Sequence, residues 1–309
     1  MWLRVLGAGA GGGFPQWNCG CPGCRAVRDG SRPASPRTQS SIAVSADRTT
    51  WFLVNASPDL RAQIEACADL RPRSKRDSPI AAVLLTDAEL DHTMGLLLLR
   101  EGPGVELHAT DASVATLREG SGFLPTLERY TRVERRQVVP GETVALRDRL
   151  TYRAFDVPTA KKARFDRAGT GEAGEAGSPG SDVGRVVGYR FTDTGSGRAA
   201  VYLPGVQEIT PAVRDELATA DVVLVDGTTW TDDEMIRLGL ASKTARDMGH
   251  LAVDGPDGSL AVLAGLPAER KIYVHINNTN PMLLEDSPEH VEVVTRGAEI
   301  ATDGLEVEV

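Results

Sequence analysis

A cluster of three cysteines constrains this chain more than any other feature of its sequence. Cys19, Cys21 and Cys24 follow a glycine-rich run, and only glycine and proline separate them. Thiolates bind Zn²⁺ well, and three of them on one short loop lose little loop-closure entropy when they converge on one ion. The cluster therefore predicts a structural zinc site whose fourth ligand comes from another segment. The alternative, a disulfide with one spare thiol, is disfavoured because cysteines this close rarely reach disulfide geometry.

The composition excludes several classes of partner. The formal charge of −9 disfavours nucleic acids and anionic membranes, which attract basic surfaces. No apolar run reaches membrane-spanning length, and the first hydrophobic segment is too short for a signal peptide. Because three of the four cysteines are clustered, a reducing compartment fits better than a disulfide framework. We expect a cytoplasmic protein in which Cys67 is a small buried apolar residue, within a helix from Asp59 to Leu70.

Short β-rich runs and helical patterns alternate along the chain. The β-rich runs are Trp2–Leu6, Ser41–Ser45, Trp51–Val54, Ile80–Leu85, Val105–Ala109, Val186–Phe191, Ala199–Leu203, Val222–Val225 and Lys271–Ile276. The helical patterns include His92–Arg100, Pro211–Ala220, Thr231–Leu238 and Pro288–Arg296. Strands come first and helices interleave later, which favours stacked layers over a doubly wound sheet. We expect one domain over residues 1–309, with a mobile surface loop from Ala168 to Gly184, where small and polar residues dominate.

The glycine run has the spacing of a dinucleotide-binding turn but lacks its context. Gly7, Gly9 and Gly12 match G-x-G-x-x-G directly after a predicted strand. A helix should begin at the third glycine, yet residues 13–19 place glycine, proline and asparagine where its first two turns would lie. We therefore expect no nicotinamide or flavin site there.

Metal-binding side chains stand at the ends of three apolar strands. Asp91 and His92 follow the strand that ends at Leu85, while Asp226 and His275 lie at the ends of two later strands. The two histidines with one of the aspartates would form a set with open coordination positions, which suits non-haem Fe(II) and dioxygen. These residue types do not decide whether the bound metal is iron or zinc. Structural roles are the alternative to metal binding: Asp91 could be a helix N-cap, and His275 could be a hydrogen-bonded core residue.

The other histidines are weaker candidates. His250 lies on a predicted loop and could still reach a site. His108 lies inside a strand pattern and His290 on an acidic helix face, so we assign neither a role.

Seven blocks of sequence cover positions from one end of the chain to the other: Val5–Cys24, Arg37–Ala43, Asn55–Asp59, Leu98–Gly102, Val225–Thr228, Met248–His250 and His275–Pro281. They resemble the pyrroloquinoline quinone (PQQ) biosynthesis protein B family. The resemblance implies a metallo-β-lactamase fold of the α/β class, a four-layer αββα sandwich in which two mixed β-sheets pack face to face with helices outside.

The metal motif of that superfamily is H-x-H-x-D-H, and residues 87–92 occupy it in this chain. Asp87 and Glu89 stand where the first two histidines belong. Their presence removes imidazole ligands from the first of two metal positions, which makes a two-metal hydrolytic mechanism doubtful. The resemblance then implies one metal held by Asp91, His92 and His275.

Two ligand positions stay open within this resemblance. Asp226 would be a fourth ligand or a supporting carboxylate. The cysteine loop resembles the structural zinc loop of a related phosphodiesterase branch, in which a histidine beside the active site supplies the fourth ligand. The matching turn here offers Asn278, so either Asn278 or His275 would complete the zinc site.

Family membership implies a step in PQQ biosynthesis: metal-dependent hydroxylation of the tyrosine ring in a cross-linked glutamate–tyrosine precursor. Ring hydroxylation needs a redox metal, Fe²⁺ being the expected ion, with free positions for dioxygen and substrate. The alternatives are a carrier that binds PQQ or its precursor for export, and an ordinary metallohydrolase. The expected partners are the small peptide-derived precursor and other proteins of the pathway, and a homodimer stays open.

Overall fold

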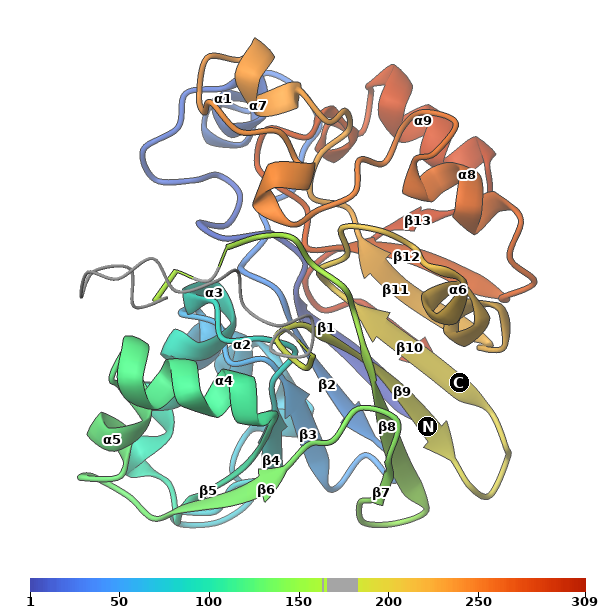
Figure 1. Ribbon diagram of the computed structural model, residues 1–309. Coiled ribbons are helices and arrows are strands. Elements are labelled where there is room, and N and C mark those ends of the chain that lie inside the picture. Colours follow the sequence, from blue (N-terminus) through green and yellow to red (C-terminus); the bar gives the residue numbers. More distant parts are fainter. Residues whose placement is uncertain (163, 166–182) are drawn as a thin grey trace, which may run out of the picture.

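Two β-sheets packed face to face form the centre of the computed structural model (Figure 1). The structure describes residues 1–162, 164–165 and 183–309. The loop predicted from Ala168 to Gly184 therefore lies outside the described residues, except for its last two positions.

Each sheet has seven strands. The first runs in the order β14 (Glu306–Glu308), β1 (Trp2–Gly7), β2 (Ser41–Ser45), β3 (Trp51–Val54), β4 (Ile80–Leu84), β5 (Val105–Ala109) and β6 (Val133–Gln137). The second runs in the order β13 (Glu299–Ile300), β12 (Arg270–Val274), β11 (Val222–Asp226), β10 (Ala199–Leu203), β9 (Val187–Asp193), β8 (Leu150–Asp156) and β7 (Thr143–Ala145). Both are mixed, because β3 to β6 and β10 to β13 pair in parallel and the other neighbours pair antiparallel.

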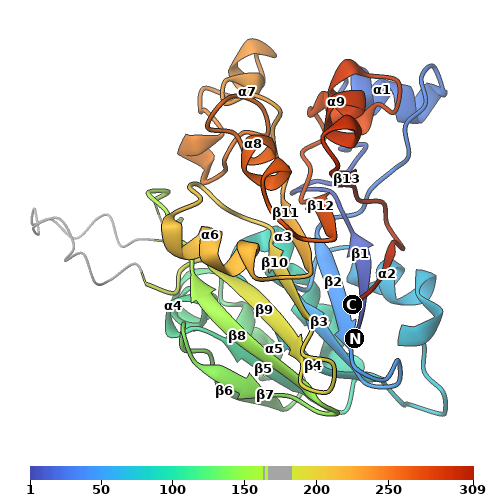
Figure 2. The same ribbon diagram turned by 90° about the vertical axis from the view of Figure 1, so that its right-hand side faces the viewer.

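Helices cover the outer faces of both sheets (Figures 1 and 2). The first sheet is covered by α2 (Leu60–Ala66), η1 (Ala68–Leu70), α3 (Leu90–Thr93), η2 (Met94–Glu101), α4 (Asp111–Ala115), η3 (Thr116–Gly120) and α5 (Phe123–Leu127). The second is accompanied by α1 (Pro22–Asp29), α6 (Pro211–Ala218), α7 (Glu234–Arg237), η4 (Arg246–Met248), α8 (Ser259–Ala264), η5 (Pro281–Leu283) and α9 (Pro288–Thr295). The result is the expected αββα sandwich. No helix in the described ranges is both long and apolar enough to cross a membrane.

Strand β3 shows how the sequence produces these layers. Phe52 and Val54 belong to the core between the two sheets, whereas Trp51 and Leu53 belong to the core beneath the outer helices. Successive side chains of a strand point to opposite faces, so a strand covered on both sides must be apolar at every position. A continuous apolar run therefore identifies a central strand of this fold.

Most of the predicted elements are present, with changes at their ends. The helix predicted from Asp59 to Leu70 breaks into α2 and η1, because Cys67 takes an extended conformation between them. Cys67 is only half-buried there, which corrects the prediction that it is a core residue. The helix predicted over Thr231–Leu238 is reduced to the short α7, and most of His92–Arg100 is 3₁₀ rather than α-helix. Strands β6, β7, β8, β13 and β14 were not predicted.

The loops that follow three strands of the two sheets converge at one edge of the sandwich. Strand β4 leads into the segment with Asp91, β11 ends at Asp226, and β12 ends just before His275. The glycine run after β1 joins them, because Gly9 forms β-bridges with Gln39 and Ile276. The molecule thus brings residues from distant parts of the sequence to one place.

Candidate metal centre

Asp91, His92 and His275 form a cluster that could hold one metal ion. Their candidate ligand atoms all lie within 4.8 Å of one another. Asp91 Oδ2 is 3.3 Å from His275 Nε2 and 3.8 Å from His92 Nε2. Asp91 is not the helix N-cap, because α3 has Glu89 at that position and Asp91 lies in its first turn.

The two ring nitrogens of His92 have different surroundings. Nδ1 donates a hydrogen bond to the Asp87 carboxylate, whose oxygens lie 2.8 and 2.9 Å away. Nε2 is buried and has no hydrogen-bond partner in the described structure. A buried polar atom without a partner is costly, and a metal ion at this position would remove that cost. The donor set therefore fits a bound cation.

Asp87 is itself held in place. Its carboxylate accepts hydrogen bonds from Thr86 Oγ1, at 2.9 Å, and from the Glu89 amide, at 2.9 Å. The neighbouring Thr86 amide donates a hydrogen bond of 3.0 Å to Asn55 Oδ1, and Asn55 has a left-handed φ of 65°. These bonds fix the carboxylate that orients the His92 ring, an arrangement that also strengthens an imidazole as a metal ligand.

His275 faces two different groups with its two nitrogens. Its backbone turns sharply after β12, with a φ of 52°. Nδ1 lies 2.9 Å from Thr228 Oγ1, while Nε2 faces Asp91. A hydrogen bond from Nδ1–H to the hydroxyl oxygen leaves Nε2 as the atom directed at the cluster.

Asp226 supports this arrangement from a fully buried position. One carboxylate oxygen accepts bonds from the amide and hydroxyl of Thr228, and the other from the Val206 amide and His250 Nδ1. His275 Nδ1 lies 3.8 Å away. Protein donors therefore engage both oxygens of Asp226, which holds the carboxylate beside His275 and His250.

His250 is part of the site, although we assigned it only a weak role from the sequence. Its Nδ1 lies 2.6 Å from Asp226 Oδ2, and its ring stacks on His275 with centroids 5.2 Å apart. The donor atoms of Asp226, His250 and His275 also lie within 4.8 Å of one another. Only the Met248–His250 block pointed to this loop, since nothing else in its sequence predicts that it reaches the edge of the sheet.

The charges of the cluster favour a cation. Burial disfavours the protonated form of His275, but hydrogen bonds to Asp226 and Asp91 outweigh it and raise its pKa to about 10. Burial also opposes ionisation of Asp91, yet the charge of His92 and the hydrogen bond from His275 lower its pKa. Burial likewise disfavours the protonated form of His92, but the charge of Asp87 outweighs this effect and raises the pKa of His92. A metal ion bound at the imidazole nitrogens would take the place of these protons beside the carboxylates.

The glycine run packs against this cluster. A Cβ at Gly11 would lie 3.3 Å from Asp91 Oδ2. Backbone bonds of 2.9 Å join Ala10 N to Ile276 O and Ile276 N to Ala8 O. No helix begins at the third glycine, as expected, since α1 starts only at Pro22. The glycines allow the chain to approach the Asp91 carboxylate closely.

Cys19, Cys21 and Cys24 form a second candidate metal cluster, with sulfur atoms within 4.8 Å of one another. All four cysteines of the chain are free thiols, so the disulfide alternative is wrong. Amide donors point at the sulfurs: Gln16 N lies 3.4 Å from Cys24 Sγ, and Cys21 N lies 3.4 Å from Cys19 Sγ. Such donors stabilise thiolates, the form that binds metals.

The fourth side of the sulfur cluster is occupied by Asn278. Its side-chain nitrogen lies 3.3 Å from Cys24 Sγ and 3.5 Å from Cys21 Sγ. The Cys21 thiol also lies 3.4 Å from the Asn278 carbonyl. The structure places His275 with Asp91 and Asn278 with the cysteines, so one turn after β12 serves both clusters.

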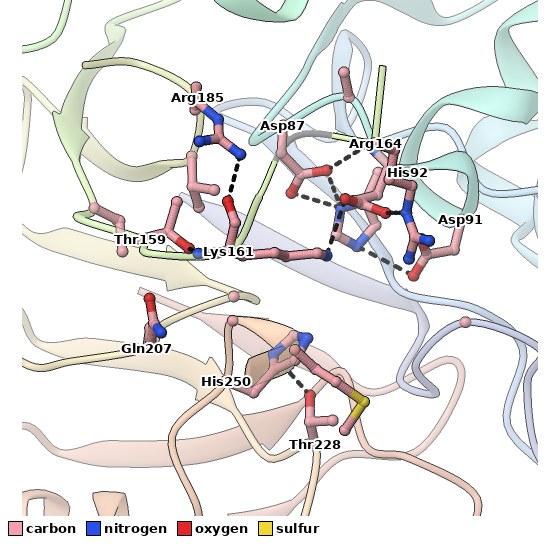
Figure 3. A pocket seen from close by; sticks show the side chains of 18 of the residues that line it. Asp87, Asp91, His92, Thr159, Lys161, Arg164, Arg185, Gln207, Thr228 and His250 are labelled. Carbon is pink, nitrogen blue, oxygen red and sulfur yellow. Dashed lines mark hydrogen bonds and ion pairs between the residues drawn. The ribbon is translucent and has the colours of Figure 1, made fainter. Parts of the chain in front are cut away.

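A cavity of about 1030 Å³ opens beside the histidines. Asp87, Asp91 and His92 lie on one side of it and Thr228 with His250 on the other (Figure 3). Glu89, whose motif position would carry a histidine, pairs instead with Lys161 Nζ at 2.9 Å and Arg164 Nε at 2.7 Å. The cavity is large enough for a bicyclic or tricyclic organic molecule next to the metal cluster.

The fold and the motif position of the cluster define a protein of the metallo-β-lactamase class. Residues 50–276 match the family model described as the beta-lactamase superfamily domain, so the chain belongs to that superfamily. It is 44% identical to coenzyme PQQ synthesis protein B of Methylobacillus flagellatus, over 99% of both chains, and 42% identical to that of Pseudomonas syringae pv. tomato, over the whole of both. The chain belongs to the coenzyme PQQ synthesis protein B family.

Solved structures agree with this assignment. The crystal structure of Zn(2+)-bound PqqB from Methylobacterium extorquens aligns over the whole of both chains with a TM-score of 0.88 and 40% identity. A diphosphatase from the PhnP family aligns with a TM-score of 0.68 and 22% identity, which shows the shared fold alone.

Proposed function

We propose that this protein acts in PQQ biosynthesis as a metal-dependent oxygenase that hydroxylates the tyrosine ring of a cross-linked glutamate–tyrosine precursor. The names of its full-length relatives support the pathway. The buried and unpartnered Nε2 of His92, beside Asp91 and His275, is the observation that carries the metal-dependent part.

Two histidines and one carboxylate would hold Fe²⁺ and leave positions open toward the cavity. When bound, the ion would supply the activation of dioxygen. Hydroxylation inserts one oxygen atom of O₂ into an aromatic C–H bond. Two electrons from a reductant and two protons convert the other oxygen atom to water. The chain's own residues orient the ligands: Asp87 holds the His92 ring, and Thr228 holds that of His275.

A two-metal hydrolase is less well supported. A second ion would need ligands at the positions of Asp87 and Glu89, together with a free oxygen of Asp226. Asp87 is bonded to His92, Glu89 is paired with Lys161 and Arg164, and donors engage both oxygens of Asp226. The residues of the first metal position thus have other structural roles.

We also propose a structural zinc held by Cys19, Cys21 and Cys24, with Asn278 on its fourth side. The convergent sulfurs and the N–H donors around them support this assignment. The relative from Methylobacterium extorquens is described as Zn(2+)-bound. This zinc would stabilise a loop with little apolar core of its own.

A carrier that binds PQQ or its precursor is the second candidate. The size of the cavity and the basic side chains on its walls favour a carrier, because a large basic cavity can bind an anionic ligand without any reaction. Stoichiometric binding without iron-dependent turnover would support this function.

The test is anaerobic reconstitution with Fe(II), addition of the cross-linked dipeptide and of ascorbate as the two-electron reductant, admission of oxygen and mass spectrometry of the product. We expect a mass gain of one oxygen atom, whose source ¹⁸O₂ would identify. His92→Ala should abolish the gain and leave the cysteine-bound zinc in place. His275→Ala should do the same. Loss of zinc alone in His275→Ala, with hydroxylation retained, would assign His275 to the cysteine site and overturn the ligand set.

A further inference from the structure

The cavity beside the metal cluster has a basic wall. The basic side chains among its described lining are Lys161, Lys162, Arg164, Arg185, Lys243 and Arg246. The acidic side chains on the same lining are Asp87, Glu89, Asp91 and Asp247. Asp87 is bonded to His92, Asp91 faces His275, Asp247 accepts from the Thr244 amide, and Glu89 is paired with Lys161 and Arg164. A divalent ion at the cluster would add to the positive charge. A cavity of this kind favours a ligand that carries several negative charges.

The neighbours of Lys161 fix its position closely. Its amide donates to Thr159 Oγ1 at 3.2 Å, and its carbonyl accepts from Arg185 Nη2 at 2.6 Å. Its ammonium lies 2.9 Å from Glu89, and the side chain is 24% exposed. Figure 3 shows the side chain extended across the cavity toward the group formed by Asp87 and His92. The charge is therefore held at Glu89, beside the start of α3, rather than in bulk solvent.

The loop that carries His250 supports the stem of Lys161. A Cβ at Gly249 would lie 3.1 Å from Lys161 Cδ, so the missing side chain leaves room for the stem. Gln207 joins the two segments, since its side chain accepts from the Ala160 amide at 2.6 Å and donates to the Arg246 carbonyl at 2.8 Å. Lys161 thus spans the distance between the His250 loop and Glu89, the residue at the start of α3.

We propose that Lys161 determines ligand specificity by binding a carboxylate of the precursor while the aromatic ring lies at the metal. This rests on the proposed function for the identity of the ligand. Glu89 holds the ammonium in place when the cavity holds no ligand, and a ligand carboxylate adds a charge-assisted hydrogen bond to the same ammonium. A carboxylate on the precursor then fixes which atom of its ring faces the cluster.

The test measures binding of PQQ, a tricarboxylate, and of its trimethyl ester to the zinc-loaded full chain. Lys161→Met removes the charge and keeps most of the stem, and we expect it to weaken PQQ binding at least about tenfold, as for loss of a hydrogen bond between charged groups. Affinity for the ester should change less than threefold. Lys75→Met, which removes the same charge from the exposed loop before β4, should leave both affinities within twofold.

Two results would overturn this inference. One is unchanged PQQ affinity in Lys161→Met with zinc content and melting temperature intact. The other is an equal loss of affinity for PQQ and ester, which would mean that Lys161 acts through shape. Turnover of the cross-linked dipeptide is assayed separately. Wild-type protein that fails to hydroxylate but binds PQQ through Lys161 would contradict the proposed oxygenase and support the inference.

Discussion

Asp87 occupies a motif position at which the superfamily carries a metal-binding histidine. In this chain the residue at that position contacts the His92 ring. Its carboxylate bonds to Nδ1 of His92 and so leaves Nε2 directed at the cluster. The substitution does more than remove a ligand from one metal position. It supplies the carboxylate partner that histidine ligands in metal sites commonly have.

Asp87→Asn should therefore weaken metal binding at the cluster by about 10- to 100-fold, because the amide lacks the charge that holds the His92 ring. Competition with a fluorescent chelator measures this affinity. The cysteine-bound zinc should remain. Glu89→Gln is the matched variant in the same motif and should have a smaller effect, since the Glu89 side chain contacts neither imidazole. Equal losses in the two variants would show that net charge alone sets the affinity.

The sequence indicated the candidate ligands more completely than the residues around them. Asp91, His92 and His275 stand at strand ends, where chemistry and local pattern coincide. Asp87 bonds to His92 within the same segment, but its role there cannot be read from the pattern of residue types. The role of His250 depends on its contact with Asp226, which belongs to another segment of the chain. Hydrophobic pattern and spacing carry no information on such contacts, so only family resemblance pointed to the His250 block.

At the level of elements, the central strands were predictable and the peripheral ones were not. Strand β3 is apolar throughout because both of its faces are covered, whereas β6 reads Val-Glu-Arg-Arg-Gln and is exposed over much of its length. An edge strand with charged side chains has the composition of a surface loop. The two-residue β13 is too short for any periodicity to appear.

The contact between residues 55–57 and the start of η2 positions the helix that carries Asp91 and His92. A Cβ at Gly95 would lie 2.1 Å from the Ser57 carbonyl oxygen, and Ala56 N donates to His92 O at 2.7 Å. Gly95→Ala should lower the free energy of unfolding by about 1–3 kcal/mol or more, because two backbone segments must separate. Urea denaturation measures the change.

Gly265→Ala is the control for that substitution. It lies at the end of α8 with a negative φ, and the nearest atom to an added Cβ is 3.6 Å away. Its effect should stay within about 0.5 kcal/mol. If both variants are equally stable, the close approach at Gly95 does not constrain the fold. Weaker metal binding in Gly95→Ala would further show that this contact places His92.

On the scale of the whole molecule, the cysteine loop joins the N-terminal segment to the second sheet. Cys24 belongs to the core beneath α6 and α8, and Cys21 contacts Asn278 across most of the length of the chain.

Cys21→Ser should remove the zinc and lower the melting temperature by at least about 5 °C, given roughly 2–4 °C for each kcal/mol lost. Metal analysis with differential scanning calorimetry tests this. A triple Cys→Ser variant with an unchanged melting temperature would contradict a structural zinc.

The turn after β12 carries His275 toward one metal cluster and Asn278, three positions later, toward the other. An ion that orders this turn from either side lowers the entropic cost of binding at the opposite side. Thermodynamics then requires reciprocity, so each ion must raise the affinity for the other by the same factor. A chain starved of zinc should accordingly bind an ion at the Asp91–His275 cluster less tightly, even though no residue of that cluster had changed.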